Sequence, residues 1–227
     1  MTGQSDIDTG WRGSREGWLD AARAALIEGG VDAVKIQPLA KRLKLSRTSF
    51  YWFFKDRDAL LAALCEDWEA GTTAPLLAAT QAYAATDTEA MLNVIACFLS
   101  GAFDAGLEYA LRAWALSDDQ ISGTLRAADD RRLAALREML AAHGHGPEDA
   151  DARARAVYLV QIGYISMRTE ETLEIRLSRI PHYVEIFTGR SATKNELARC
   201  EAQLHQAQDA RAEGGPSRPA DAANSKA

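Results

Sequence analysis

The stretch LAKRLKLSRTSFYWFFKDRDALL, residues 39–61, decides how this chain folds. Apolar residues recur at helical spacing on both sides of a short break at residues 44–46. Pro38 is tolerated in the first turn of a helix over 36–43, and Ser46 can cap a further helix over 47–53. Two short helices joined by a tight turn form a helix-turn-helix unit.

The segments on either side are also predicted to be helical. One helix should begin near Ser14, a suitable N-cap, and end at Gly29 and Gly30. Asp56 is a good N-cap for a helix that turns its apolar stripe toward the rest of the protein. The apolar faces of these two helices are expected to hold Trp18, Ala22, Ala25 and Leu26, and Leu60, Leu61, Leu64 and Trp68.

Beyond residue 71 the pattern stays helical and shows hardly any β-branched alternation, so the fold class is all-α. The longest helices are expected over 118–142, 148–167 and 173–187. A polar helix over 194–211 precedes a tail, 214–227, whose Gly, Pro, Ser and Ala content predicts disorder. We expect a DNA-binding domain over 11–57, a helical body over 58–190, and the polar helix and tail over 191–227.

The charge of the chain is unevenly distributed. The net charge is −6, which taken alone argues against a nucleic-acid binder. Residues 11–57, however, hold ten Lys or Arg against five acidic residues, a surplus of five positive charges, so the remainder carries eleven net negative charges. A basic head on an acidic body is expected of a protein whose one end meets phosphates.

Other function classes find little support. Long uncharged apolar runs and a secretory signal are both missing, so we expect a cytoplasmic protein. Cys65, Cys97 and Cys200 are far apart and read as isolated reduced thiols, and no metal or cofactor is expected. The chain has no phosphate-binding loop, HExxH motif or nucleophile elbow, and His143 and His145 read as surface residues of a Gly-rich turn, so we expect no enzyme.

The stretch 39–61 strongly resembles the DNA-binding signature of the TetR family of bacterial transcription regulators. The resemblance implies an N-terminal three-helix DNA-binding domain followed by an all-helical ligand-binding and dimerisation domain. Three positions depart from the family pattern: Lys44 stands at the usual turn glycine, Phe53 at a common histidine and Lys35 at a usual hydroxyl cap. Lys44 must therefore adopt a left-handed conformation or alter the turn.

The N-terminal turn of a recognition helix points into the major groove, so the helix over 47–53 supplies the candidates for base contacts. These are Arg47, Thr48, Ser49 and Trp52, and the further expected DNA contacts, mainly to phosphates, are Lys35, Gln37, Lys44, Tyr51, Lys55 and Arg57. Phe50 and Phe54 lie four residues apart and are expected in the core. Lys41, Arg42 and Lys44 fit a solvated face as well as a phosphate contact.

A helix-turn-helix reads a palindromic operator in double-stranded DNA as a dimer with two half-sites. The helices over 153–167 and 173–187 carry more apolar surface than one core-facing stripe needs, and in TetR-type dimers the last two helices of each subunit form a four-helix bundle. The expected homodimer residues are Val157, Leu159, Val160, Ile162, Ile165, Ile175, Ile180, Val184 and Phe187.

By analogy with the family, the body senses a small apolar or aromatic effector whose binding releases a repressor from DNA. The residues expected to line its cavity are Met91, Ile95, Phe98, Phe103, Tyr109, Trp114 and Tyr164; each taken alone fits a plain core better, and they indicate a cavity only as a group. The alternative is a DNA-binding adaptor or architectural dimer without a ligand.

Overall fold

The structure, a computed structural model, describes residues 13–214. These residues form helices and turns without any strand, in agreement with the all-α prediction. The predicted tail over 214–227 lies outside the described residues from residue 215 onward. The helices are α1 (Arg15–Gly29), η1 (Val31–Ala33), α2 (Ile36–Leu43), α3 (Arg47–Phe50), α4 (Arg57–Trp68), η2 (Glu69–Thr73), α5 (Ala74–Gln81), α6 (Asp87–Leu99), α7 (Ala105–Ala115), α8 (Asp119–Ala142), α9 (Pro147–Ser166), α10 (Leu173–Thr188) and α11 (Lys194–Gly214).

Several helices begin where the sequence predicts. The Ser14 side chain accepts from the Gly17 N–H at 3.0 Å, and Asp56 Oδ1 accepts from the Ala59 N–H at 2.8 Å. Each of these N-caps satisfies an amide that has no partner within its helix. The polar helix α11 is also present over the predicted residues.

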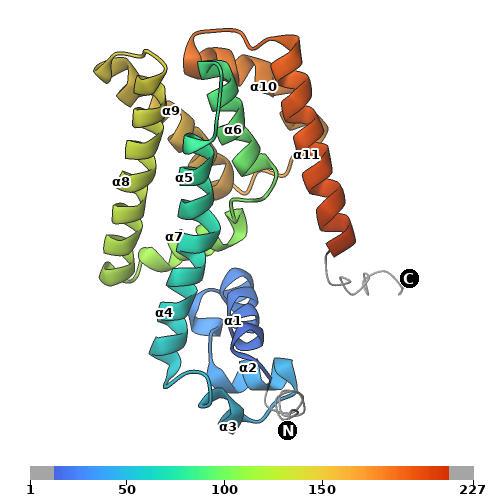
Figure 1. The fold of residues 1–227 in the computed structure, drawn as a ribbon. Helices are drawn as coiled ribbons and strands as arrows, with labels where there is room; N and C mark the ends of the chain where they lie inside the picture. The colour runs from blue at the N-terminus through green and yellow to red at the C-terminus, as the bar shows by residue number, and fades with distance from the viewer. Residues whose placement is uncertain (1–12, 215–227) are drawn as a thin grey trace, which may run out of the picture.

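The molecule consists of a small head, α1 to α3, below a larger helical body (Figure 1). One continuous helical rod, α4, η2 and α5, runs from the head up into the body (Figure 1), and the π-helical turn η2 interrupts it in the middle. In the body, α8 packs along α9, while α6 lies between α5, α10 and α11.

Two apolar cores stabilise this arrangement. The lower core surrounds the fully buried Trp18, Phe50 and Trp68 and continues from the head into α4, α7 and the start of α8. The upper core joins α5, α6, α9, α10 and α11 to the second half of α8. Because the lower core crosses residue 57, the head is anchored to the body through packed side chains.

Candidate DNA-binding surface and body cavity

The turn of the helix-turn-helix is built around Lys44. This residue has φ +56°, in the left-handed region, and the amides that follow α2 bond back to it: Lys44 N–H to Lys41 O at 3.2 Å and Leu45 N–H to Ala40 O at 2.9 Å. This is a Schellman-type ending, in which the left-handed position usually holds glycine. The chain therefore completes this left-handed turn with a lysine instead of the usual glycine.

The recognition helix is shorter than predicted. Ser46 caps it as expected, but regular helix ends at Phe50 instead of residue 53. The amides of residues 51–53 bond three residues back, as in a 3-10 turn. Phe50 and Phe54 are both buried as predicted, with their rings stacked 5.5 Å apart, and Trp18 meets the Phe50 ring edge-on at 5.3 Å.

Most of the predicted DNA contacts lie on the surface of the head. Tyr51 is 49% and Trp52 64% exposed, which is unusual for aromatic side chains in a small domain. Arg47 Nη2 donates to the Tyr51 hydroxyl at 3.3 Å, so these two side chains stand together. The other exposed members of the predicted set are Lys35, Gln37, Lys44, Thr48 and Lys55.

Two members of the set are placed differently. Ser49 is buried, and its hydroxyl donates to Ser46 O at 2.6 Å, so it belongs to the helix cap rather than to the base-reading surface. Arg57 is half-buried and donates to Val34 O and Val31 O, both at 2.7 Å, which ties α4 to the carbonyls that precede α2. Its guanidinium is thus engaged inside the head.

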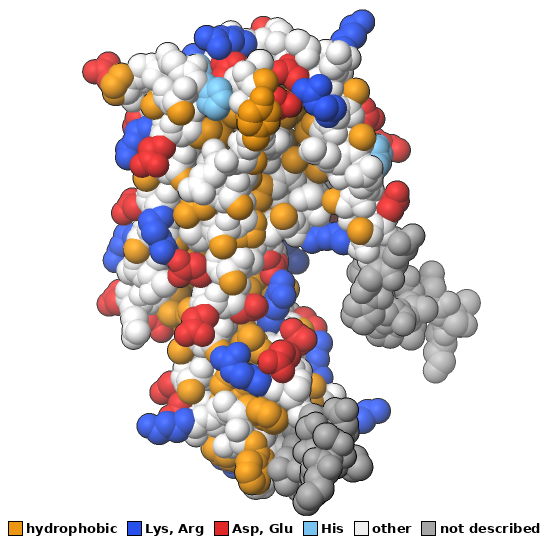
Figure 2. Space-filling view, in the orientation of Figure 1, with side chains coloured by type: hydrophobic (Ala, Val, Ile, Leu, Met, Phe, Trp, Pro, Cys, Tyr) orange, Lys and Arg blue, Asp and Glu red, His pale blue; other side chains and the backbone are white. Residues whose placement is uncertain are grey.

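A shallow hollow lies beside the recognition helix. Four predicted DNA contacts line it, Lys35, Gln37, Arg47 and Arg57, together with Ile36, Pro38 and Lys41. Arg42, by contrast, is held by two hydrogen bonds of 2.8 and 2.9 Å to Glu28 on α1, and these lower the pKa of that carboxyl. In Figure 2, hydrophobic side chains gather at the lower tip of the head, with Lys and Arg on its flanks.

The body contains a cavity of about 300 Å³ between α1, α7, α9 and the start of α10. Four of the seven predicted ligand residues line it: Phe98, Phe103, Tyr109 and Tyr164. Ile95 lines a much smaller void next to it. Met91 and Trp114 are buried in the upper and lower cores and do not reach the cavity, so they are core residues.

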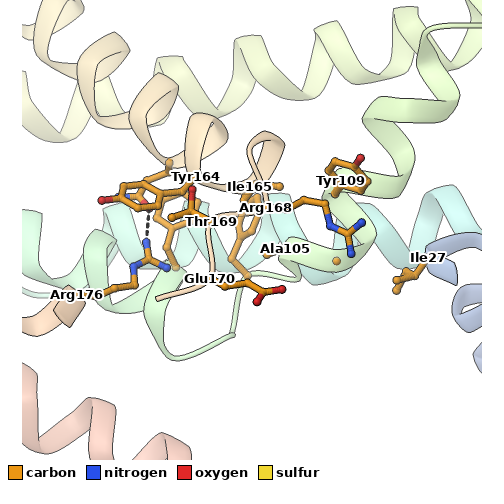
Figure 3. Close-up of a pocket in the computed structure, with 13 residues that line it drawn as sticks. Ile27, Ala105, Tyr109, Tyr164, Ile165, Arg168, Thr169, Glu170 and Arg176 are labelled. Atoms are coloured by element: carbon orange, nitrogen blue, oxygen red, sulfur yellow. Dashed lines mark hydrogen bonds between the residues drawn. The ribbon is translucent and has the colours of Figure 1, made fainter. Parts of the chain in front are cut away.

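Sequence reasoning missed the polar part of this cavity, which comes from α9, the α9–α10 turn and α10 (Figure 3). The additional lining residues are Ile27, Ala105, Gly106, Gln161, Ile165, Arg168, Thr169, Glu170 and Arg176. Apolar periodicity does not reveal charged residues that reach a cavity from a turn. Ile27 belongs to α1, so one wall of the cavity is part of the head.

Above the cavity, a buried ionic network joins the rod to the body. Arg132 on α8 is fully buried and donates to Glu108 Oε1 at 3.0 Å and to the Tyr158 hydroxyl at 2.8 Å. Burial alone would lower the pKa of Arg132, but the charge interactions and hydrogen bonds with Glu108 and Tyr158 together outweigh it and raise the pKa. The same guanidinium bonds Thr72 and Thr73 of η2, and Trp68 Nε1 donates to Glu108 at 2.7 Å. Every member therefore has a partner, as a buried charge requires.

The predicted dimer residues divide between the core and the surface. Val157, Ile180, Val184 and Phe187 are buried within the chain itself and are therefore core residues. Of the others, Leu159 and Ile175 are exposed on α9 and α10, Val160 and Ile162 are half-buried against the upper core, and Ile165 is half-buried and lines the cavity. Met167 and Ile186 are also exposed.

No metal site is found among residues 13–214, where groups of three or more His, Cys, Asp or Glu side chains do not converge. Burial raises the pKa of Cys97 to about 12 and that of Cys200 to about 11, so neither thiol is reactive near neutral pH. Within the same residues, a helix long and apolar enough to cross a membrane is not present.

Comparison with known proteins agrees with this geometry. The family model of bacterial regulatory proteins, tetR family, matches residues 19–64, from within α1 to within α4. No curated protein matches the chain.

Similar solved structures include a transcriptional regulator of Rhodococcus sp. Rha1 (17% identity over 86% of this chain and 96% of that chain, TM-score 0.47). A second is a TetR transcriptional regulator of Agrobacterium tumefaciens (22% identity over 86% of this chain and 92% of that chain, TM-score 0.41). A third is a possible TetR family transcriptional regulator of Streptomyces coelicolor A3(2) (19% identity over 88% of this chain and 99% of that chain, TM-score 0.36). We draw no conclusion from likenesses at these low TM-scores. The residues that the family model matches, 19–64, comprise the helix-turn-helix together with the helices that hold it, and this part of the chain is similar to the tetR family of bacterial regulatory proteins.

Proposed function

We propose that the chain is a homodimeric repressor that reads a palindromic operator through α3 and leaves it when a small molecule fills the body cavity. The observation that supports the reading of DNA is the exposure of Tyr51 and Trp52 beside Arg47 at the tip of the head. Arg47 is placed to offer paired donors to guanine, and Thr48 and Trp52 to contact a thymine methyl. Lys35, Gln37, Lys44, Tyr51 and Lys55 are assigned to the phosphates on either side.

This division of roles is tested on DNA selected by the protein from a random pool of duplexes. Arg47→Ala and Trp52→Ala should each cost about 1 to 3 kcal/mol of binding free energy on the selected sequence and relax the base preference. Lys55→Ala should weaken all sequences alike and reduce the slope of affinity against salt by about one. Arg126→Ala, an exposed arginine on α8, is the matched control. Equal loss of specificity in both classes of variant would contradict the assignment.

For the dimer, we propose that a second copy of the chain covers the outer face of α9 and α10. Leu159 is 61% exposed there, and a helix-turn-helix dimer needs to hold its two heads roughly 34 to 36 Å apart. Two antiparallel helices from each copy would bury this face as a four-helix bundle.

Leu159→Glu should convert the dimer into a monomer of 24.7 kDa in sedimentation equilibrium, because it places a charge at the centre of an apolar contact. Leu116→Glu is the control, since Leu116 is 89% exposed at the end of α7, away from this face. If Leu159→Glu remains dimeric, the second copy is seated elsewhere.

The ligand response is proposed to pass through the turn between α6 and α7. Its residue Asp104 forms an ion pair with Arg23 on α1, and the Asp104 N–H donates to Gly71 O of η2 at 2.8 Å. Ile27 on α1 lines the cavity directly. A ligand that prefers one orientation of α1 would therefore shift the population of head positions by its difference in affinity.

Ile27→Ala tests this route, because the side chain is exposed and its loss should leave the fold intact. We expect a cavity ligand to bind the variant with similar affinity by calorimetry but to release less DNA. If ligands fill the cavity of the unmodified protein and never change its DNA affinity, the adaptor without a sensory role is the better description.

A further inference from the structure

One arginine in the cavity faces it without a carboxylate partner. Arg176, at the start of α10, is half-buried, and its guanidinium lies 4.6 Å from the centre of the Tyr164 ring. Its Nη2 donates to the Gln161 side-chain oxygen at 3.4 Å, a long bond that leaves its other donors available. Burial lowers the pKa of Arg176, because the charged form of the side chain is less stable away from water.

The acidic residues near the cavity do not pair with Arg176. Glu171 attracts the Arg176 charge without forming an ion pair with it: its Oε1 is paired with Arg179 at 2.5 Å, and its Oε2 is buried without a hydrogen-bond partner among residues 13–214. Glu170 lines the cavity, and in Figure 3 its carboxylate is turned away from Arg176. Among the described residues, 13–214, none forms an ion pair with Arg176. A partly buried cation in this position is expected to have an anionic partner.

A second cation lies at the other side of the cavity (Figure 3). Arg168 has φ +50°, and the bonds Arg168 N–H to Ile165 O at 3.1 Å and Thr169 N–H to Tyr164 O at 3.2 Å place it where a helix usually ends with glycine. Its guanidinium lies 5.3 Å from the centre of the Tyr109 ring. A non-glycine residue in this backbone conformation is strained and is often retained for a function.

We infer that the ligand of this cavity is a carboxylate with an aromatic or aliphatic body, and that Arg176 binds its carboxylate group. Phe98, Phe103 and Tyr164 would receive the apolar body, with Gln161 orienting Arg176. Arg168 lies at the exposed rim, where it attracts an anion toward the opening. The inference rests on the proposed use of this cavity as the effector site and specifies the chemical class of the effector.

The size of the cavity limits the ligand. At about 300 Å³ it lies at the lower end of the range for small-molecule sites and suits a body of one or two rings. Suitable probes are 2-naphthoate and phenylacetate, each paired with its neutral amide of nearly the same shape. The comparison of acid and amide isolates the charge.

The experiment measures the binding of these four probes to the full-length protein by calorimetry and by the shift in thermal midpoint, at fixed protein concentration. We expect at least one acid to bind about 10- to 100-fold more tightly than its amide, and Arg176→Gln to abolish that preference. Arg126→Gln, an equivalent change on the exposed side of α8, should retain it. Circular dichroism confirms that both variants are folded.

The outcomes separate this inference from the proposed function. Amides that bind as tightly as the acids, acids that bind Arg176→Gln unchanged, or no binding by any probe would each overturn the carboxylate assignment. Release of selected DNA is measured separately by fluorescence anisotropy. An acid that binds through Arg176 without changing DNA affinity would leave the carboxylate site standing and overturn the ligand-controlled repressor.

Discussion

Replacement of the buried Arg132 by Met should strongly destabilise the protein. Arg132 donates to Thr72, Thr73, Glu108 and Tyr158 at 2.7 to 3.0 Å, and Met fills much of its volume without supplying one of these bonds. Removing one member of a buried ion pair typically costs about 3 to 5 kcal/mol, because the other charge is left without compensation. Glu108 would keep Arg112 at 2.7 Å, so we expect a loss near the lower limit, about 3 kcal/mol.

Urea unfolding at fixed protein concentration measures this loss, with the exposed change Arg126→Met as control. A double variant, Arg132→Met with Glu108→Gln, removes both buried charges and leaves Arg112 paired with Asp129 at 2.6 Å. It should therefore be more stable than the sum of the single losses predicts, by about 1 to 2 kcal/mol. Additive losses, or a single loss no larger than that of Arg126→Met, would refute the view that the network is held by charge compensation.

Two further predictions concern a turn and a helix cap. Lys44→Gly should relieve the strain of the left-handed backbone, so the free energy of unfolding should be unchanged or up to about 1 kcal/mol higher. The variant should also bind all DNA sequences more weakly to a similar extent and reduce the slope of affinity against salt by about one. A clear loss of stability in urea would contradict this prediction. Burial alone would raise the pKa of Glu196, but hydrogen bonds from Thr86, Thr193 and Thr88 outweigh it and lower the pKa from 4.5 to about 2. A lowered pKa stabilises the fold fully above the unfolded value, so stability should fall as the pH drops from about 4.5 toward 2, and Glu196→Gln should flatten that fall in acid unfolding curves. An unchanged acid slope in the variant would show that other carboxylates dominate.

The sequence could predict those features that depend on neighbouring residues. Ser14 and Asp56 cap their helices as expected, because an N-cap needs only its own side chain and an amide three residues on. The left-handed Lys44 was one of two expected outcomes for the same local reason. The length of α3 could not be predicted, since burial of both Phe50 and Phe54 against α1 and α4 depends on packing across the head.

The surfaces of the body depended on contacts distant in sequence. In α9 the buried residues recur at helical spacing, which marks the core stripe and leaves Leu159 outside it; they are Ala150, Ala154, Val157, Tyr158 and Gln161. This periodicity can be read from the sequence, but the number of apolar residues in α9 does not distinguish its core-facing side from its exposed side. Arg176 and Phe98 both line the cavity although almost eighty positions separate them in the sequence, and no local sequence pattern predicts such a contact.

The continuous rod of α4, η2 and α5 has a mechanical consequence. Arg132 is hydrogen-bonded to the rod at Thr72, and fifteen residues separate Thr72 from Arg57 at the head. At 1.5 Å per residue this distance is about 22 Å, which is the length of the lever arm. A tilt of roughly 10° about Thr72 would swing the recognition helix by about 4 Å, and opposite tilts in two subunits would change the spacing of the heads by about 8 Å. Against a half-site spacing of about 34 to 36 Å, this is enough to take both helices out of register with the major groove. In the proposed homodimeric repressor, a small displacement at Thr72 would thus be enough to separate a bound from a released operator.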